Sequence, residues 1–131
     1  MILHRVIIGL IVLAGLINFA PVVGVLSGAR VESLYGIELL DPTLEILLRH
    51  RAVLFGLVGG FMIVAAFKPH LHAAAIIGGS IAMVSFLALY FFTSTQPSSL
   101  ISIVYADVVG LVALFMAMVL KQIKQRGSGL R

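Results

Sequence analysis

Four ionisable residues interrupt long apolar stretches of this sequence. Arg49, His50 and Arg51 are consecutive, and Asp107 lies alone in a later stretch. An arginine side chain offers up to five hydrogen-bond donors and no acceptor, whereas an ionised aspartate offers only acceptors. A histidine can gain or lose a proton near neutral pH. If they are brought together, residues of these types can bind a ligand with polar oxygen atoms or relay a proton.

No catalytic motif organises these residues further. Asp107, His50 and Ser85 are the residue types of a hydrolase triad, but such types occur together by chance too readily to predict one. The sequence contains no phosphate-binding glycine loop, HExxH motif or EF-hand loop. It also contains no cysteine, which excludes disulfides and thiolate chemistry. We predict no catalytic residue, no metal site and no cofactor, and enzymatic activity is not the first expectation.

Three histidines are a weaker candidate for metal binding. His70 and His72 follow Lys68 in a short polar turn, and His4 could approach them from the N-terminus. Imidazoles are common zinc ligands, but no carboxylate or thiol lies nearby in the sequence. We therefore expect a solvated turn rather than a metal site.

The amino-acid composition is that of a membrane protein. Of the 131 residues, 61% are hydrophobic and 11% are charged, against about 25% charged in a soluble domain. A surface with so few charges requires lipid as its solvent. The net charge of +4 does not indicate nucleic-acid binding, because the basic residues lie mostly at the ends of the apolar stretches.

The apolar stretches predict an all-α membrane protein, a four-helix transmembrane bundle in a single domain covering residues 1–131. Each stretch has the roughly 20 residues that the hydrocarbon core requires. The expected helices cover about 6–26, 42–67, 71–92 and 100–120, followed by a flexible basic tail at 121–131 that includes Gly127, Ser128 and Gly129. Asp41 and Pro42 should cap and start the second helix, and Lys68 with Pro69 should end it. A cleavable signal peptide is the alternative for the first stretch, but its apolar core exceeds the usual length of about 7–15 residues.

The distribution of charge predicts that both termini face the cytoplasm. Loops on the cytoplasmic side are enriched in Lys and Arg. This orientation places six of the nine basic residues inside, namely Arg5, Lys68, Lys121, Lys124, Arg126 and Arg131. It places four of the five acidic residues outside, namely Glu32, Glu38, Asp41 and Glu45.

The first outer loop, residues 27–40, is long for a helix connection and mixes apolar with charged residues. We expect a short amphipathic helix lying on the outer membrane interface. Aromatic side chains often mark the headgroup region, so Tyr35 is expected to anchor this helix at that depth.

Close packing between the spanning helices is expected at small residues. The clearest pattern is Gly56-x-x-x-Gly60, with Ala52 one turn earlier. Comparable patterns elsewhere consist of Gly24 and Gly28, of Ala75, Gly79 and Ala82, and of Ala106, Gly110, Ala113 and Ala117.

The residues that could do chemistry lie at similar depths in the predicted helices. At a rise of about 1.5 Å per residue, Asp107 lies about 12 Å below the outer end of its helix, and Arg49 to Arg51 lie about 10–14 Å below the end of theirs. The other polar residues at or just above this depth are Asn18, Ser85, Tyr90 and Tyr105. Ionisable groups at that depth cost roughly 2.5–3.5 kcal/mol each, and face the bundle interior or a water-filled cavity.

The spacing of the charges suggests how they pair. Glu45 precedes Arg49 by four residues, the order that favours a helical ion pair. Asp107 is therefore expected to pair with Arg51, with Arg49 as the other candidate. This layer either specifies the register of the helices or lines a small polar pocket, and three cationic or titratable side chains against one acid favour the pocket. The predicted ligand-binding residues are Arg49, His50, Arg51, Asp107, Asn18 and Tyr105.

The stretch LLRHRAVLFG at residues 47–56 resembles a family of small bacterial inner-membrane proteins. LYGI at 34–37, Asp41-Pro42 and Ala106-Asp107 fit the same pattern, so the resemblance covers nearly the whole chain. It implies a layout similar to the four-helix DoxX-like proteins. Because these include subunits linked to quinone reduction, the resemblance implies a quinone or a lipid as a ligand.

Many members of that family carry the name phosphopantetheine adenylyltransferase. That enzyme is a soluble α/β nucleotidyltransferase with a His-containing nucleotide motif, and this sequence predicts neither the sheet nor the motif. We therefore do not expect that activity.

Three hypotheses for function follow. The first is a membrane protein that binds a small amphipathic ligand, a quinone or a lipid headgroup, in the polar layer of the outer leaflet. The second is an accessory subunit of a larger membrane complex, or of a homo-oligomer, without a ligand of its own. The third is a membrane-embedded enzyme or proton-coupled carrier with Asp107 or His50 as its proton site. The lipid bilayer is the expected partner in each, and nucleic acid in none.

Overall fold

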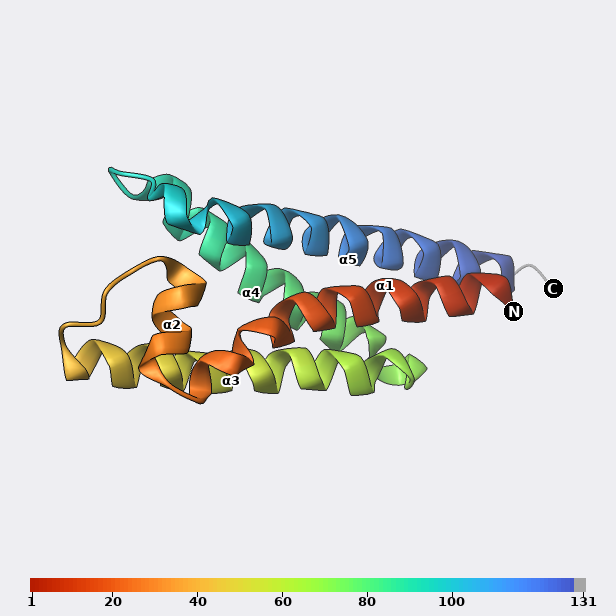
Figure 1. The fold of residues 1–131 in the computed structure, drawn as a ribbon. Coiled ribbons are helices and arrows are strands. Elements are labelled where there is room, and N and C mark those ends of the chain that lie inside the picture. Colours follow the sequence, from red (N-terminus) through yellow and green to blue (C-terminus); the bar gives the residue numbers. More distant parts are fainter. Residues whose placement is uncertain (129–131) are drawn as a thin grey trace.

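Four long helices run lengthwise through the protein, and one short helix crosses one end (Figure 1). The computed structural model describes residues 1–128. The long helices are α1 (Ile2–Phe19), α3 (Pro42–Ala66), α4 (His72–Phe92) and α5 (Ile101–Ser128), and the short one is α2 (Gly28–Tyr35). Single 3-10 segments adjoin them: η1 (Ala20–Val25), η2 (Pro69–Leu71) and η3 (Ser98–Leu100). Within residues 1–128 no strand is formed.

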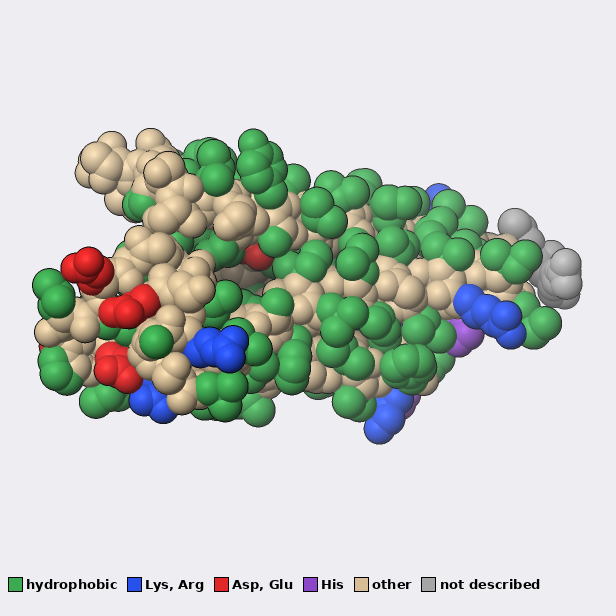
Figure 2. All heavy atoms as spheres, in the orientation of Figure 1, with side chains coloured by type: hydrophobic (Ala, Val, Ile, Leu, Met, Phe, Trp, Pro, Cys, Tyr) green, Lys and Arg blue, Asp and Glu red, His purple; other side chains and the backbone are tan. Residues whose placement is uncertain are grey.

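The four long helices with their 3-10 segments are each long and apolar enough to cross a membrane, at 24 to 30 residues. The predicted four-helix membrane bundle is therefore confirmed. Successive helices run antiparallel, so that four crossings bring both chain ends to one end of the bundle (Figure 1). We call this the termini end and the opposite one the α2 end. Apolar side chains cover the length of the helices, and acidic side chains gather at the α2 end (Figure 2).

The packed core lies toward the termini end of the bundle. There α1 packs along α3 and α5, and α4 packs along α5 and α3. Two methionines fill the space beside glycines of neighbouring helices, Met62 against Gly79 and Met83 against Gly110. The buried core residues are Ile7, Ile11, Ala14, Met62, Ala65, Ala66, Ala75, Ile76, Met83, Leu114 and Ala117.

Helices α1 and α3 come into backbone contact at Gly15 and Gly59. A Cβ atom on Gly59 would lie 2.5 Å from the backbone nitrogen of Phe19 and 2.6 Å from the carbonyl oxygen of Gly15. A Cβ atom on Gly60 would meet only the Phe19 ring, at 3.9 Å. In the predicted Gly56-x-x-x-Gly60 pattern, Gly60 makes only a loose contact with α1. The tight backbone contact lies at Gly59 instead, because neighbouring residues of a helix point about 100° apart.

The first spanning segment is not one continuous α-helix as predicted for residues 6–26. It is α-helical to Phe19 and continues as the 3-10 segment η1. Pro21 explains the change, because it has no backbone N–H and its ring clashes with the carbonyl of Ile17 four residues earlier. Beyond this point the segment packs against α3.

Helix α2 is the predicted amphipathic helix of the first loop. The Ser27 hydroxyl accepts a hydrogen bond from the backbone N–H of Arg30 at 3.3 Å, and Gly36 ends the helix in the left-handed conformation (φ 62°). The expected surface anchor at Tyr35 is wrong. Tyr35 and Val31 are buried, because this face of α2 turns toward the bundle and packs on η1 and α3.

The predicted flexible tail is wrong for the part of it that the structure describes. Helix α5 continues to Ser128 instead of ending at residue 120. Residues 121–126 are Lys, Gln, Ile, Lys, Gln and Arg, most of which are good helix formers. Gly129 and Arg131 lie outside the described residues.

Candidate ligand site at the α2 end

A cavity of about 200 Å³ lies among α1, η1, α2, α3, α4 and α5. Most of its wall is apolar. The polar side chains that line it are Asn18, Tyr35, Arg51, Ser102 and Asp107. Figure 2 shows a hollow on this face of the molecule, with one acidic side chain visible at depth.

Arg51 of α3 is held by aromatic rings from three helices. Its guanidinium carbon lies 5.6 Å from the ring centre of Tyr35 on α2, 5.0 Å from Phe55 on α3 and 5.7 Å from Phe86 on α4. Each such cation–π contact contributes about 0.5–1 kcal/mol when exposed and about 2 kcal/mol when desolvated. Arg51 forms no hydrogen bond or ion pair with any residue that the structure describes. The rings therefore orient a guanidinium whose donors are unused. We call Arg51 with these three rings the aromatic clamp.

Asp107 reaches the same cavity from α5. Its half-buried carboxylate is attracted electrostatically by Arg51, but the one ion pair found within residues 1–128 joins Arg49 to Glu45. The predicted direct pair of Asp107 with an arginine is therefore wrong. The reason is geometric: the aromatic clamp holds Arg51 against α2 and α4, and α5 brings Asp107 to another part of the wall.

The end of α1 forms a further part of the wall. Ile17, Asn18, Ala20 and Pro21 line the cavity where α1 gives way to η1. The buried Asn18 donates from Nδ2 to the carbonyl oxygen of Ala14 at 3.3 Å. The helix break that Pro21 causes therefore lies directly at the cavity.

A second hollow of about 560 Å³ lies between α3 and α4. It shares Arg51, Phe55 and Phe86 with the cavity, so these three members of the aromatic clamp lie between the two. Its remaining lining is mostly apolar, with Ser85 and Tyr90 among the polar members. An apolar chain lying in this hollow would bring a polar head to Arg51.

Three of the predicted site residues are brought together, and three are not. Asn18, Arg51 and Asp107 line one cavity. His50 is exposed, Tyr105 is 66% exposed, and Arg49 binds elsewhere. Helix geometry explains the separation, because residues one or two apart on a helix point about 100° or 200° away from each other. Arg49 and His50 on α3, and Tyr105 on α5, therefore point away from the cavity that Arg51 and Asp107 line.

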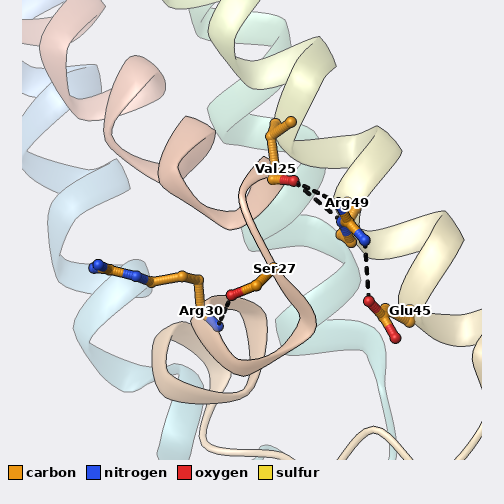
Figure 3. A network of polar contacts seen from close by, with 5 residues as sticks. All are labelled: Val25, Ser27, Arg30, Glu45 and Arg49. Carbon is orange, nitrogen blue, oxygen red and sulfur yellow. Dashed lines mark hydrogen bonds and ion pairs between the residues drawn. The ribbon is translucent and has the colours of Figure 1, made fainter.

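Arg49 ties the end of η1 to α3 (Figure 3). Its Nε and one terminal nitrogen donate to the carbonyl oxygen of Val25 at 3.1 and 2.9 Å. Its other terminal nitrogen donates to Oε1 of Glu45 at 3.1 Å, which confirms the helical ion pair expected from their spacing. The carbonyl at the end of a 3-10 segment has no helical partner, so Arg49 has a structural role here.

Arg49→Met should weaken the attachment of η1 to α3 and leave the lining of the cavity unchanged. Hydrogen bonds to charged groups contribute about 1.5–3 kcal/mol, and the 42% exposure of the Arg49 side chain reduces this. We expect a loss of about 1 kcal/mol in the free energy of unfolding, measured by denaturant titration in detergent. His50→Leu, one residue away and exposed, is the control and should change stability by less. Equal effects of both would contradict the role of Arg49.

The aromatic members of the clamp were not among the predicted site residues. Phe55 follows Arg51 by four residues, and this spacing places them on one helix face, so the sequence contained a signal for that contact. Tyr35 and Phe86 come from other helices, and no local spacing connects them with Arg51.

The fold and this cavity define the class of the protein: a small multi-pass membrane protein whose four-helix bundle has its buried core toward the termini end and this cavity at the α2 end. Comparison of the chain with protein-family models, with curated proteins and with solved structures finds no match.

Proposed function

We propose that the protein binds a small amphipathic ligand, a quinone or a lipid headgroup, in the cavity between Arg51 and Asp107. The observation that carries the proposal is the aromatic clamp. It orients a guanidinium toward a hollow, and no described residue uses its donors. Arg51 is half-buried, so its guanidinium is accessible to an oxygen atom of a ligand. Hydrogen bonds to charged groups contribute about 1.5–3 kcal/mol.

The charges around the cavity favour a quinone over a lipid phosphate. A quinone carbonyl can accept from Arg51, and its reduced form can donate a hydroxyl to Asp107. The ring would meet the aromatic side chains of the clamp, and an apolar tail would fit the hollow between α3 and α4. A phosphate would also be attracted to Arg51, but an ionised Asp107 would repel it.

The proposal includes a location in the bacterial inner membrane with both termini in the cytoplasm. It is supported by the charge distribution, since five basic residues of the described chain and no Asp or Glu side chain lie at the ends of the helices near the termini. It is also supported by the resemblance of residues 34–56 to a family of small bacterial inner-membrane proteins.

Filling the cavity tests the proposed site without changing a charge. Ala106 lines the cavity, so Ala106→Leu should displace the ligand while the protein stays folded. Ala73→Leu on the exposed face of α4 is the matched control. Protein extracted in mild detergent would be analysed by native mass spectrometry for a co-purifying quinone or lipid. We expect a stoichiometric adduct in the wild type and in Ala73→Leu, and at least a tenfold loss in Ala106→Leu.

The same measurement separates the proposal from its competitors. No adduct in any variant, with a folded monomer, would favour the subunit hypothesis. An adduct unaffected by Ala106→Leu would place the ligand elsewhere. An enzyme or proton carrier would need a turnover that depends on Asp107.

Labelling of introduced cysteines tests the orientation. The chain has no cysteine of its own, so single cysteines at Gly127 and at Ser98 are unique labels. Both positions are exposed. Ser98 lies in η3, just before α5 begins, and Gly127 lies near the other end of α5. An impermeant thiol reagent added to whole cells should label the variant at Ser98 and not the one at Gly127. Labelling of the Gly127 variant alone would contradict the proposed orientation and indicate the opposite one.

A further inference from the structure

A second polar hollow lies at the termini end of the bundle, opposite to the cavity at the α2 end. It has a volume of about 180 Å³ and lies among α1, η2, α4 and α5. His4, His72, Lys121 and Lys124 contribute its charged and titratable side chains. We call it the basic pocket. Since a water molecule occupies roughly 30 Å³ in the liquid, this volume holds a partly hydrated phosphate group.

His72 is built into this pocket and does not lie in a solvated turn, which corrects the expectation for the turn after Lys68. Its side chain is 3% exposed. Its Nε2 lies 2.8 Å from the carbonyl oxygen of Ala66, and because a carbonyl has no proton to give, Nε2 is the donor. The His4 ring stacks on it with ring centres 6.2 Å apart. Among the described residues no group of three metal-ligating side chains is assembled.

The lysines of the pocket have no anionic partner. Lys121 and Lys124 are three residues apart on α5, so both can face the pocket from one side of the helix. Neither forms an ion pair or hydrogen bond with a residue in the described part of the chain. The sequence has no Asp or Glu between residues 1 and 31, between 46 and 106, or after Asp107. Two cations held side by side without a counter-ion repel each other, and an anion in the pocket would remove that repulsion.

We propose that the basic pocket binds the phosphate of an anionic lipid headgroup. The pocket lies where α1, α4 and α5 reach the end of their membrane-spanning segments, which is the depth of lipid phosphates. Basic pockets between membrane helices bind such headgroups. Ile7 and Pro69 give the pocket an apolar border, against which the glycerol backbone of a lipid can lie. A soluble phosphate ester has the same anion but no group that would use this border.

Lipid titration of the detergent-solubilised full chain tests this inference. Short-chain phosphatidylglycerol, phosphatidylcholine and inorganic phosphate are added separately, and binding is followed by native mass spectrometry and by the thermal unfolding midpoint. We expect binding of phosphatidylglycerol at least tenfold tighter than that of phosphatidylcholine. Each lysine near an anionic lipid contributes about 1 kcal/mol, and 1.4 kcal/mol is a factor of ten. The double variant Lys121→Gln/Lys124→Gln should therefore bind phosphatidylglycerol about 30-fold more weakly.

A charge-matched variant controls for net charge. Lys68→Gln/Arg126→Gln removes two positive charges at the same end of the bundle, but neither residue lines the pocket. It should retain wild-type affinity for phosphatidylglycerol. Equal weakening in both double variants would overturn the inference, as would equal binding of the two lipids. If inorganic phosphate alone saturates the pocket and displaces the lipid, the proposal of a lipid ligand is overturned and a soluble phosphate ligand is indicated. None of these outcomes depends on the cavity at Arg51, which Ala106→Leu tests separately.

Discussion

Gly59→Leu is expected to abolish folding of the bundle, and Gly59→Ala to destabilise it. The backbones of α1 and α3 touch at this position, where an added Cβ atom would lie 2.5 Å from the backbone nitrogen of Phe19. Backbone atoms cannot rotate away as a side chain can, so the two helices would have to separate. Added volume in a packed core costs about 1–3 kcal/mol, and we expect Gly59→Ala at the upper end of this range and Gly59→Leu beyond it.

Gly60 is a matched control, for which substitution by alanine is expected to change stability in the opposite direction. A Cβ atom on Gly60 would make only an ordinary contact, at 3.9 Å from the Phe19 ring. Alanine favours a helix interior over glycine by about 1 kcal/mol. Gly60→Ala should therefore leave stability unchanged or raise it. The free energy of unfolding in mixed detergent would be compared for the two alanine variants. A loss of stability that is the same for both would refute the assigned crossing point.

The double substitution Arg51→Met/Asp107→Leu should abolish ligand binding and leave the fold intact. An ionisable group at membrane depth costs roughly 2.5–3.5 kcal/mol, and both costs disappear in the variant. The loss of the cation–π contacts to Tyr35, Phe55 and Phe86 offsets part of this gain. Native mass spectrometry should show no adduct, while the unfolding midpoint stays within a few degrees of the wild type.

The single variants sharpen this expectation. Removing one partner of a buried ion pair costs about 3–5 kcal/mol, but Arg51 and Asp107 do not form an ion pair. Asp107→Leu alone should therefore destabilise the protein by clearly less than that. The double variant Glu45→Gln/Arg49→Met removes a real ion pair outside the cavity and should keep the ligand. If a folded Arg51→Met/Asp107→Leu variant still binds the ligand, the aromatic clamp contributes to packing and not to ligand binding.

The two ends of the bundle differ in a way that fits a binding protein. Toward the termini end, methionines of one helix fill the space beside glycines of the next, and a cluster of buried apolar side chains forms the core. Toward the α2 end, Pro21 breaks α1 and the aromatic clamp separates two hollows. Rigid packing at one end can hold the helices in register while the other end stays open to a ligand.

The sequence alone was sufficient to predict the membrane bundle. Apolar stretches of about 20 residues admit few other structures, because every backbone polar group in lipid must be satisfied within a helix or a closed barrel. Asp41 and Pro42 start α3 as predicted, with the Asp41 carboxylate accepting from the backbone N–H of Thr43 at 2.8 Å. The pair of Glu45 and Arg49 was also predictable, since it depends on helical spacing within one segment.

Only the tertiary structure decided which polar residues meet. Residues 49, 50 and 51 lie at nearly one depth, but the rotation of α3 turns Arg51 to the cavity, leaves His50 exposed and directs Arg49 to Val25. Gly59 of the same helix lies against α1, a contact that hydropathy does not encode. Tyr35 was predicted to be a surface anchor and is instead a buried ring. The position at which α2 folds back depends on long-range packing. The depth of a residue along a helix does not determine the direction in which its side chain points.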